Sequence, residues 1–271
     1  MPVEKKEDTV IWRKRDRRQA TIHWLITLGI GLVILVCARI INNQTEWSYL
    51  ENAHLQGQDL AMRMFPPHWP YAVELIGPLI DTIHIATLGT IVGVMIASPL
   101  AFLCARNTTP SVTFVRPVAL MLLVTSRSVN SLIWALLLVV ILGPGMLSGI
   151  LAIALRSVGF CGKLLYEAIE EIDENTVNAV RSTGASRAQV LAFGVVPQIA
   201  PAFAGISVYR WDINIREATI LGLVGAGGIG MALQTSIDTL AWSQVGVIFV
   251  GILATVVLSE WVSAKARAAV T

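Results

Sequence analysis

The sequence predicts an all-α polytopic membrane protein with about six transmembrane helices, and three observations support this fold class. Hydrophobic residues make up 55% of the chain and charged residues only 14%, whereas soluble chains carry roughly 25% charged residues. Apolar runs of the roughly 20 residues that cross a bilayer recur along the chain. Lys and Arg crowd into the segment before the first run, which is typical of a cytoplasmic terminus.

The same composition excludes several functional classes. A net charge of +2 offers no general basic surface for nucleic acid. The three cysteines form no CxxC pair, and the four histidines lack metal-ligand spacing. No Ser/His/Asp or Cys/His arrangement falls in a plausible polar site. We therefore expect no catalytic residue, no metal site and no cofactor bound by this chain.

Six runs are long and apolar enough to span the membrane. They cover residues 22–41, 79–105, 112–142, 146–166, 195–214 and 242–264. The predicted divisions are an N-terminal segment (1–21), a first helix (22–41), an aromatic-rich segment (42–76), a transmembrane domain (77–264) and a tail (265–271).

The distribution of basic residues predicts the orientation. Seven Lys and Arg residues precede the first span, whereas segment 42–76 holds Arg63 alone against four acidic residues. Cytoplasmic segments carry the excess of Lys and Arg, so the N-terminus is expected inside and segment 42–76 outside. An even number of spans returns the C-terminus, with Lys265 and Arg267, to the cytoplasm.

The external segment mixes aromatic, apolar and polar residues from Trp47 to Tyr71. This mixture predicts a short amphipathic helix that lies in the membrane interface and ends at Pro66-Pro67. Two interpretations stay open for it: an interfacial anchor, or a docking surface for an external partner.

The longest charged stretch inside the cell lies between the fourth and fifth spans. It predicts two short helices that meet at Gly184, the first capped by Glu174 or Asn175 and the second by Ser186. Pro197 then opens the fifth span, where its missing N–H is harmless. The apolar residues of these helices form a face that something must cover; they are Val177, Val180, Val190, Leu191 and Phe193.

This stretch contains Asn178-Ala-Val-x₃-Gly184-x₁₁-Val196-Pro197, which resembles the EAA loop of binding-protein-dependent ABC importer permeases. In that family the loop forms coupling helices that sit in a groove of the ATPase subunit. The chain departs from the pattern because Asn178 replaces the glutamate of the triplet. The resemblance implies a coupling role for Glu167, Glu174, Asn178, Ala179, Gly184, Ala185, Arg187 and Pro197.

Further segments resemble the permeases of phosphonate, phosphite and hypophosphite importers; they are 81–93, 99–107, 162–173, 209–222 and 225–230. The resemblance implies a five-helix type I importer core, to which helix 22–41 adds a sixth, in a bacterial inner membrane. It also implies a second copy of the chain, two cytoplasmic ATPases that bind ATP and Mg, and an external substrate-binding protein. Import of a phosphorus oxyanion would proceed by alternating access. A methionine-like cargo is the alternative substrate.

Several polar side chains fall within or beside the predicted spans, where charge is costly unless it faces a cavity or a partner. Arg127 and Asn130 lie in a polar break of the third span. Arginine suits phosphoryl oxygens because its fork donates two parallel hydrogen bonds. Two interpretations stay open, an anion pathway and internal ion pairs, for Arg127, Asn130, Arg156, Arg210, Asp212, Asn214 and Arg216.

Two glycine motifs are excluded as nucleotide sites. Gly159 to Lys163 lacks the P-loop spacer and is followed by Leu164, so the ATPase must be another chain. The GxGxxG spacing comes after a span rather than a strand, which favours a close-packed, re-entrant turn between the last two spans. That turn contains Gly225, Gly227, Gly228 and Gly230.

A secondary transporter that works without ATP is the rival from another class. It would need intramembrane carboxylates for proton coupling, and the candidates all lie near predicted span ends; they are Asp81, Asp212, Glu217 and Glu260.

Overall fold

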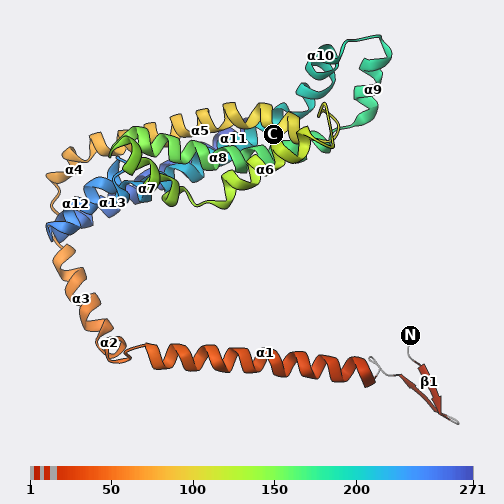
Figure 1. Cartoon of the computed structure of the whole chain (residues 1–271). Helices are drawn as coiled ribbons and strands as arrows, with labels where there is room; N and C mark the ends of the chain where they lie inside the picture. Colours follow the sequence, from red (N-terminus) through yellow and green to blue (C-terminus); the bar gives the residue numbers. More distant parts are fainter. Residues whose placement is uncertain (1–2, 7–8, 13–16, 271) are drawn as a thin grey trace. The chain divides into compact units, whose positions relative to one another are not determined.

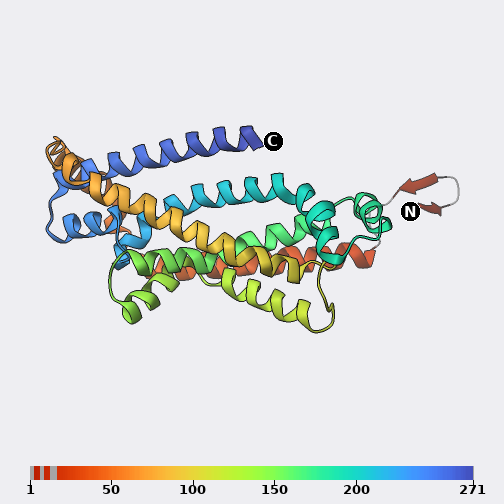
Figure 2. The same ribbon diagram turned by 90° about the horizontal axis from the view of Figure 1, so that it is seen from above.

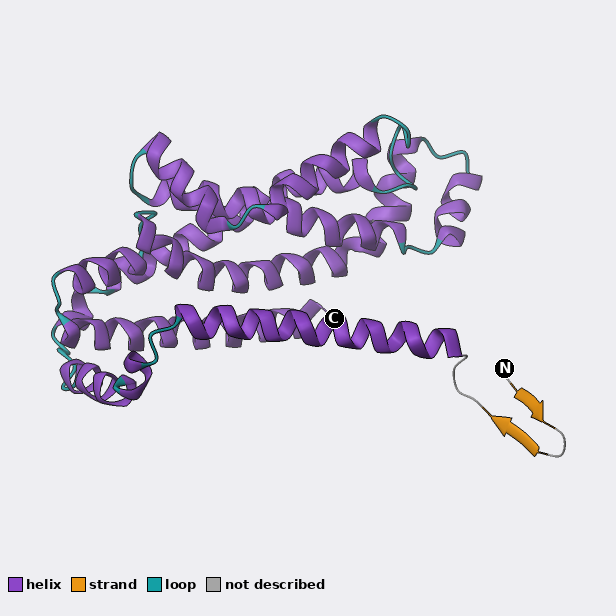
Figure 3. Cartoon of the chain, turned by 60° about the horizontal axis from the view of Figure 1, so that its bottom comes forward, coloured by secondary structure: helices purple, strands orange, loops and turns teal. Residues whose placement is uncertain are grey.

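The computed structural model describes residues 3–6, 9–12 and 17–270 and divides into two units, Met1–Leu60 and Ala61–Thr271. The first unit opens with an antiparallel hairpin of β1 (Val3–Lys6) and β2 (Thr9–Trp12). In the described residues these are the only strands, as Figure 3 shows. The hairpin lies within the segment predicted to precede the first helix, and the basic residues 13–15 lie outside the described residues.

Three helices follow the hairpin. Helix α1 (Arg17–Gln44) begins earlier than the predicted residue 22, and large apolar side chains are exposed around its whole circumference. A helix that is apolar on every side is suited to lipid. Helices α2 (Ser48–Glu51) and α3 (Ala53–Met64) occupy the aromatic-rich segment. Helix α3 ends just before Pro66-Pro67, where the sequence predicts a stop.

The second unit is a bundle of long helices with short ones at both ends. Its elements are α4 (Tyr71–Glu74), α5 (Ile76–Cys104), α6 (Val115–Ser128), α7 (Ser131–Leu142), α8 (Met146–Glu170), α9 (Glu174–Ser182), α10 (Arg187–Val190), a π-helical turn (Leu191–Val195), α11 (Val196–Leu221), a 3₁₀ turn (Gly222–Val224), α12 (Ile229–Asp238) and α13 (Trp242–Val270).

The predicted all-α membrane fold is confirmed. Five segments of the described chain are long and apolar enough to cross a membrane, and α6 with α7 makes a sixth if the pair is counted as one span. The third predicted span, 112–142, is wrong as a single helix: α6 and α7 are bent by 88° at residues 129–130. The polar break there causes the bend, because Asn130 caps the start of α7 with its side chain.

Three helices continue beyond the ends of the predicted spans. Helix α8 continues to Glu170 rather than residue 166, α11 to Leu221 rather than 214, and α13 to Val270 rather than 264. Each of these predicted spans ends where charged residues begin in the sequence. Helix α11 continues past Arg216 and Glu217, whose side chains form ion pairs with Asp212 and with Arg156.

Helices α5, α8 and α11 run side by side through the bundle, and α6 and α13 lie on opposite sides of them (Figure 2). Small residues allow the closest approach: a Cβ added at Gly89 or Gly93 of α5 would lie only 2.7 Å from Ile153 Cγ2 or 2.6 Å from Ser157 Cβ of α8. Helices α9 and α10 project from one end of the bundle, and α4 and α12 lie at the other (Figure 1).

Candidate functional site

Three charged side chains meet between α8 and α11. Arg156 Nη1 lies 3.1 Å from Glu217 Oε1, and Arg210 Nη2 lies 3.4 Å from Glu217 Oε2. Arg210 Nη2 lies equally close, at 3.4 Å, to Glu217 Oε1, so both arginines contact Oε1 and Arg210 also contacts Oε2. We call Arg156, Arg210 and Glu217 the charge cluster.

Arg210 is the fixed member of the charge cluster. The residue is only 1% exposed, and its Nε donates a hydrogen bond to Ser157 Oγ at 3.0 Å. Its guanidinium also lies 5.0 Å from the centre of the Phe160 ring, close enough for a cation–π attraction. Contacts from two helices thus hold Arg210 in place.

Arg156 is the open member, with 31% of its side chain exposed. Besides Glu217, its Nη1 donates to Ser131 Oγ at 3.1 Å and to Asn130 Oδ1 at 3.4 Å. Asn130 and Ser131 lie where the bent α6–α7 pair breaks. One guanidinium on α8 therefore connects this break to α11.

The charge cluster carries one positive charge in excess, because two arginines share one glutamate. Arg127, at the end of α6, adds to this charge: it is exposed and has no carboxylate within ion-pair distance in the described part of the chain. Its backbone packs against Gly159, less than one helical turn from Arg156. The region favours an anion, since unpaired positive charge inside a membrane is costly.

The remaining polar candidates bond to other side chains of the bundle. Asp212 pairs with Arg216 one turn along α11 and accepts a hydrogen bond from Ser259 Oγ of α13 at 3.0 Å. Asn214 Nδ2 donates to Thr90 Oγ1 of α5 at 2.7 Å and to Ser157 Oγ at 3.0 Å. Asp212 and Asn214 thus connect α11 to neighbouring helices, whereas Arg216 pairs within α11.

Glu217 was missed as a site residue, as were Ser131 and Ser157. From the sequence, Glu217 is only a proton-coupling candidate. Its spacing of seven residues from Arg210 places both on one face of a helix, which is the signal that could have linked them. The partnership with Arg156 has no such signal, because α8 and α11 meet only in the folded chain.

The loop between α8 and α11 has the two predicted short helices. The predicted cap of the first is wrong: Asp173, rather than Glu174 or Asn175, accepts from Asn175 N at 2.9 Å. Asp173 takes this role because its extended backbone turns its carboxylate toward the first turn of α9. The hydrogen bond from Asn175 N, together with one that Thr176 Oγ1 donates to the same carboxylate at 3.1 Å, lowers the pKa of the Asp173 carboxyl.

The rest of the loop follows the prediction. Ser186 caps α10, and Gln189 completes a capping box. Gly184 has φ of +80° in the turn between the helices, and Pro197 lies in the first turn of α11.

Most of the apolar face of this loop is covered by the chain itself. Val177 and Val190 are buried against Leu165 and Ile169 at the end of α8. Phe193 remains 72% exposed. Of the five apolar residues on the predicted face of this loop, Phe193 is thus the one that the chain leaves exposed.

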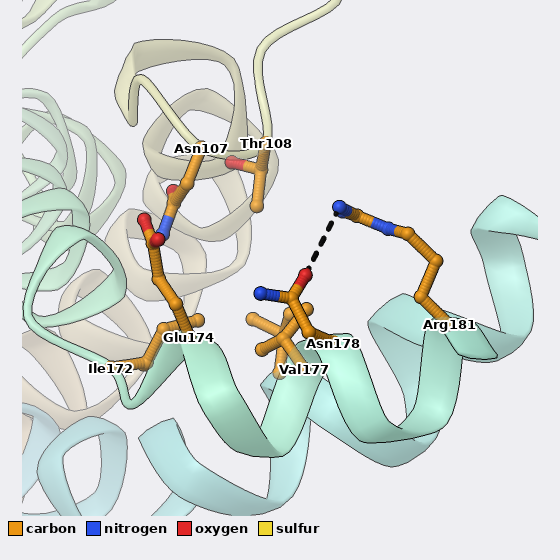
Figure 4. A pocket seen from close by; sticks show the side chains of 8 residues that line it. Asn107, Thr108, Ile172, Glu174, Val177, Asn178 and Arg181 are labelled. Carbon is orange, nitrogen blue, oxygen red and sulfur yellow. Dashed lines mark hydrogen bonds between the residues drawn. The ribbon is translucent and has the colours of Figure 1, made fainter.

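A hollow of about 210 Å³ opens beside α9. Figure 4 shows Asn178 and Arg181 on α9, joined by a 3.3 Å hydrogen bond, with Asn107 and Thr108 across the hollow. Most of the predicted coupling residues are exposed: Glu174, Asn178, Ala179, Gly184, Arg187 and Pro197. The other two, Glu167 and Ala185, are half-buried.

The glycine-rich turn joins α11 to the short α12 and packs closely. Gly225, Gly227 and Gly228 all have positive φ, from +71° to +86°, and a Cβ added at Gly222 would lie 2.6 Å from the Gly230 Cα. Gly145 N donates to Gly225 O at 2.9 Å. The turn is therefore a packing element beside the start of α8.

Comparisons with known proteins fit this architecture. Residues 89–264 match the family described as binding-protein-dependent transport system inner membrane component. The chain is 39% identical over 242 residues to the phosphite transport system permease protein PtxC of Stutzerimonas stutzeri, covering 89% of this chain and 87% of that protein. It is 40% identical over 200 residues to the phosphate-import permease protein PhnE of Mycolicibacterium smegmatis, covering 72% and 37%. An inward-facing MetNI methionine ABC transporter superposes with a TM-score of 0.65 at 18% identity, over 74% of this chain and 98% of that one.

Proposed function

The chain belongs to the family of binding-protein-dependent transport system inner membrane components, and we propose that it is the permease of an ATP-driven importer for a phosphorus oxyanion. The observation that carries this cargo class is the excess positive charge of Arg156, Arg210 and Glu217 inside the bundle. A guanidinium binds a phosphoryl group through two parallel hydrogen bonds. Similarity to a phosphite permease supports the same class.

The proposed complex contains two copies of this chain, two cytoplasmic ATPases that bind ATP and Mg, and an external binding protein. One copy offers too few spans to enclose a pathway, so a second copy is expected around a shared axis. Both termini and helices α9 and α10 would lie in the cytoplasm. ATP would close the ATPase pair, pull the α9–α10 loops together and open the permease outward; hydrolysis would reset it.

Phe193 is expected to anchor the ATPase. It is 72% exposed, whereas the other apolar residues of the loop pack on the chain itself. We expect Phe193→Ser to weaken ATPase binding at least tenfold, because burial of a Phe side chain stabilises an interface by about 1.5–3 kcal/mol. Co-purification of the ATPase with the permease measures this. Phe203→Ser, a change in the bundle rather than in the loop, is the matched control, and equal loss from both variants would contradict the assignment.

Two rival functions fit the geometry less well. A proton-coupled secondary transporter needs an intramembrane carboxylate without a cationic partner, but two of the four candidates have one: Glu217 pairs with two arginines and Asp212 with Arg216. Methionine, the alternative cargo, is a zwitterion and leaves the excess positive charge unbalanced.

The experiment that tests the proposal is ATP hydrolysis by the reconstituted complex with its binding protein. Phosphite, methylphosphonate, phosphate and methionine are added in turn. Stimulation by a phosphorus oxyanion is expected. Stimulation by methionine alone would overturn the cargo class, and uptake into vesicles without ATP would overturn the importer.

A further inference from the structure

We propose that Glu217 is a displaceable counter-ion: the oxyanion cargo binds Arg156 by taking the place of Glu217, which stays paired with Arg210. This inference rests on the proposed function and assigns its site. The ligand class is a small anion with at least two oxygens on one centre, which matches the fork of a guanidinium.

Exposure selects Arg156 rather than Arg210 as the binding residue. Its side chain is 31% exposed, compared with 2% for Arg210. Arg210 is also committed to Ser157 and to the Phe160 ring. An anion that reaches the cluster therefore meets the guanidinium of Arg156 first.

The pairing of Glu217 makes the exchange feasible. A buried carboxylate that loses its only partner is strongly destabilised, and such a site would resist the cargo. Glu217 has two partners: Arg156 lies at Oε1, and Arg210 Nη2 donates to both Oε1 and Oε2 at 3.4 Å. When the cargo takes Arg156, the bond to Arg210 remains, so no charge is left without a partner.

The exchange also prevents trapping. A transport site must bind strongly enough to admit its cargo and weakly enough to release it. Because Glu217 remains beside Arg156, it competes for the same guanidinium and lowers the net affinity for the cargo. Its return expels the anion and restores the neutral pair.

Cargo arrival would thereby change the packing of the bundle. Arg156 connects Asn130 and Ser131, at the break of the α6–α7 pair, to Glu217 on α11. Transfer of Arg156 from Glu217 to the cargo leaves the contact with the break and removes the contact with α11. The bent pair is then free to move relative to α11, which links occupancy to motion.

The test measures cargo binding and turnover separately in the reconstituted complex. Radiolabelled phosphite is the probe, with phosphate and methylphosphonate as competitors. We expect Glu217→Gln to bind phosphite at least threefold more tightly and to turn over at least threefold more slowly, because the competing charge is gone. Arg156→Gln should lose binding more than tenfold. Glu217→Asp, which keeps the charge, should stay within twofold of the unaltered complex.

The controls separate the possible failures. Glu260→Gln removes an exposed carboxylate from α13 and should change neither quantity. A Glu217→Gln complex that binds and turns over like the unaltered one, or that loses both together, overturns the exchange and leaves the cargo class standing. An unaltered complex that binds none of the three oxyanions overturns both proposals.

Discussion

Replacement of Gly184 by valine is expected to reduce ATP-driven uptake at least tenfold while the permease still inserts in normal amounts. Gly184 has φ of +80°, a region that is strained for residues with a β-carbon and most of all for β-branched ones. Such strain costs on the order of 1–3 kcal/mol. The turn would escape it by changing the angle between α9 and α10, the two helices proposed to meet the ATPase.

Steric conflict does not contribute to this effect, because no atom lies within 4 Å of a Cβ added at Gly184. Within this chain the backbone is therefore the expected cause, and Gly184→Asn is the matched control. Asparagine tolerates left-handed backbone, so this variant should retain more than half of the uptake. Uptake in proteoliposomes and membrane content by immunoblot are the measurements. Equal loss from the asparagine and valine variants would show that side-chain size, rather than φ, matters at this position.

The helices and the loop could be predicted because their signals are local. A span needs only an apolar run of sufficient length, and the cap at Ser186 needs only the residues that follow it. Gly184 and Pro197 mark a turn and a helix start through their own backbone properties. The break at Asn130 was visible as a polar interruption, although the 88° bend was not.

The charge cluster could be predicted only in part because its geometry depends on tertiary packing. Arg156 and Arg210 were recognised as intramembrane charges, but sequence alone did not reveal that Glu217 lies between them. The same limit explains the helix end at Leu221, since a charged residue ends an apolar run whether or not the fold supplies its partner. It also explains why the sequence predicted an uncovered apolar face on the loop: the end of α8 covers Val177 and Val190 only in the folded chain.

Replacement of Arg210 by glutamine is expected to cost more stability than any other change in the charge cluster. Arg210 is 1% exposed and bonds both Glu217 and Ser157. Removal of one partner of a buried ion pair costs about 3–5 kcal/mol, and the remaining pair of Glu217 with Arg156 favours the lower end. At roughly 2–4 °C per kcal/mol for a chain of this size, the Tm in detergent should fall by at least about 6 °C.

Arg216→Gln is the matched control on the same helix. Its side chain is 47% exposed, compared with 5% for its partner Asp212. Asp212 keeps the hydrogen bond from Ser259 Oγ when Arg216 is replaced, so the Tm should fall by less than in Arg210→Gln. Arg156→Gln should resemble Arg216→Gln in Tm but lose phosphite binding. An Arg210→Gln variant with unchanged Tm and lost binding would assign cargo contact to Arg210 and contradict the division of roles. The two variants are therefore expected to differ in what they lose: Arg210→Gln loses stability, and Arg156→Gln loses cargo binding.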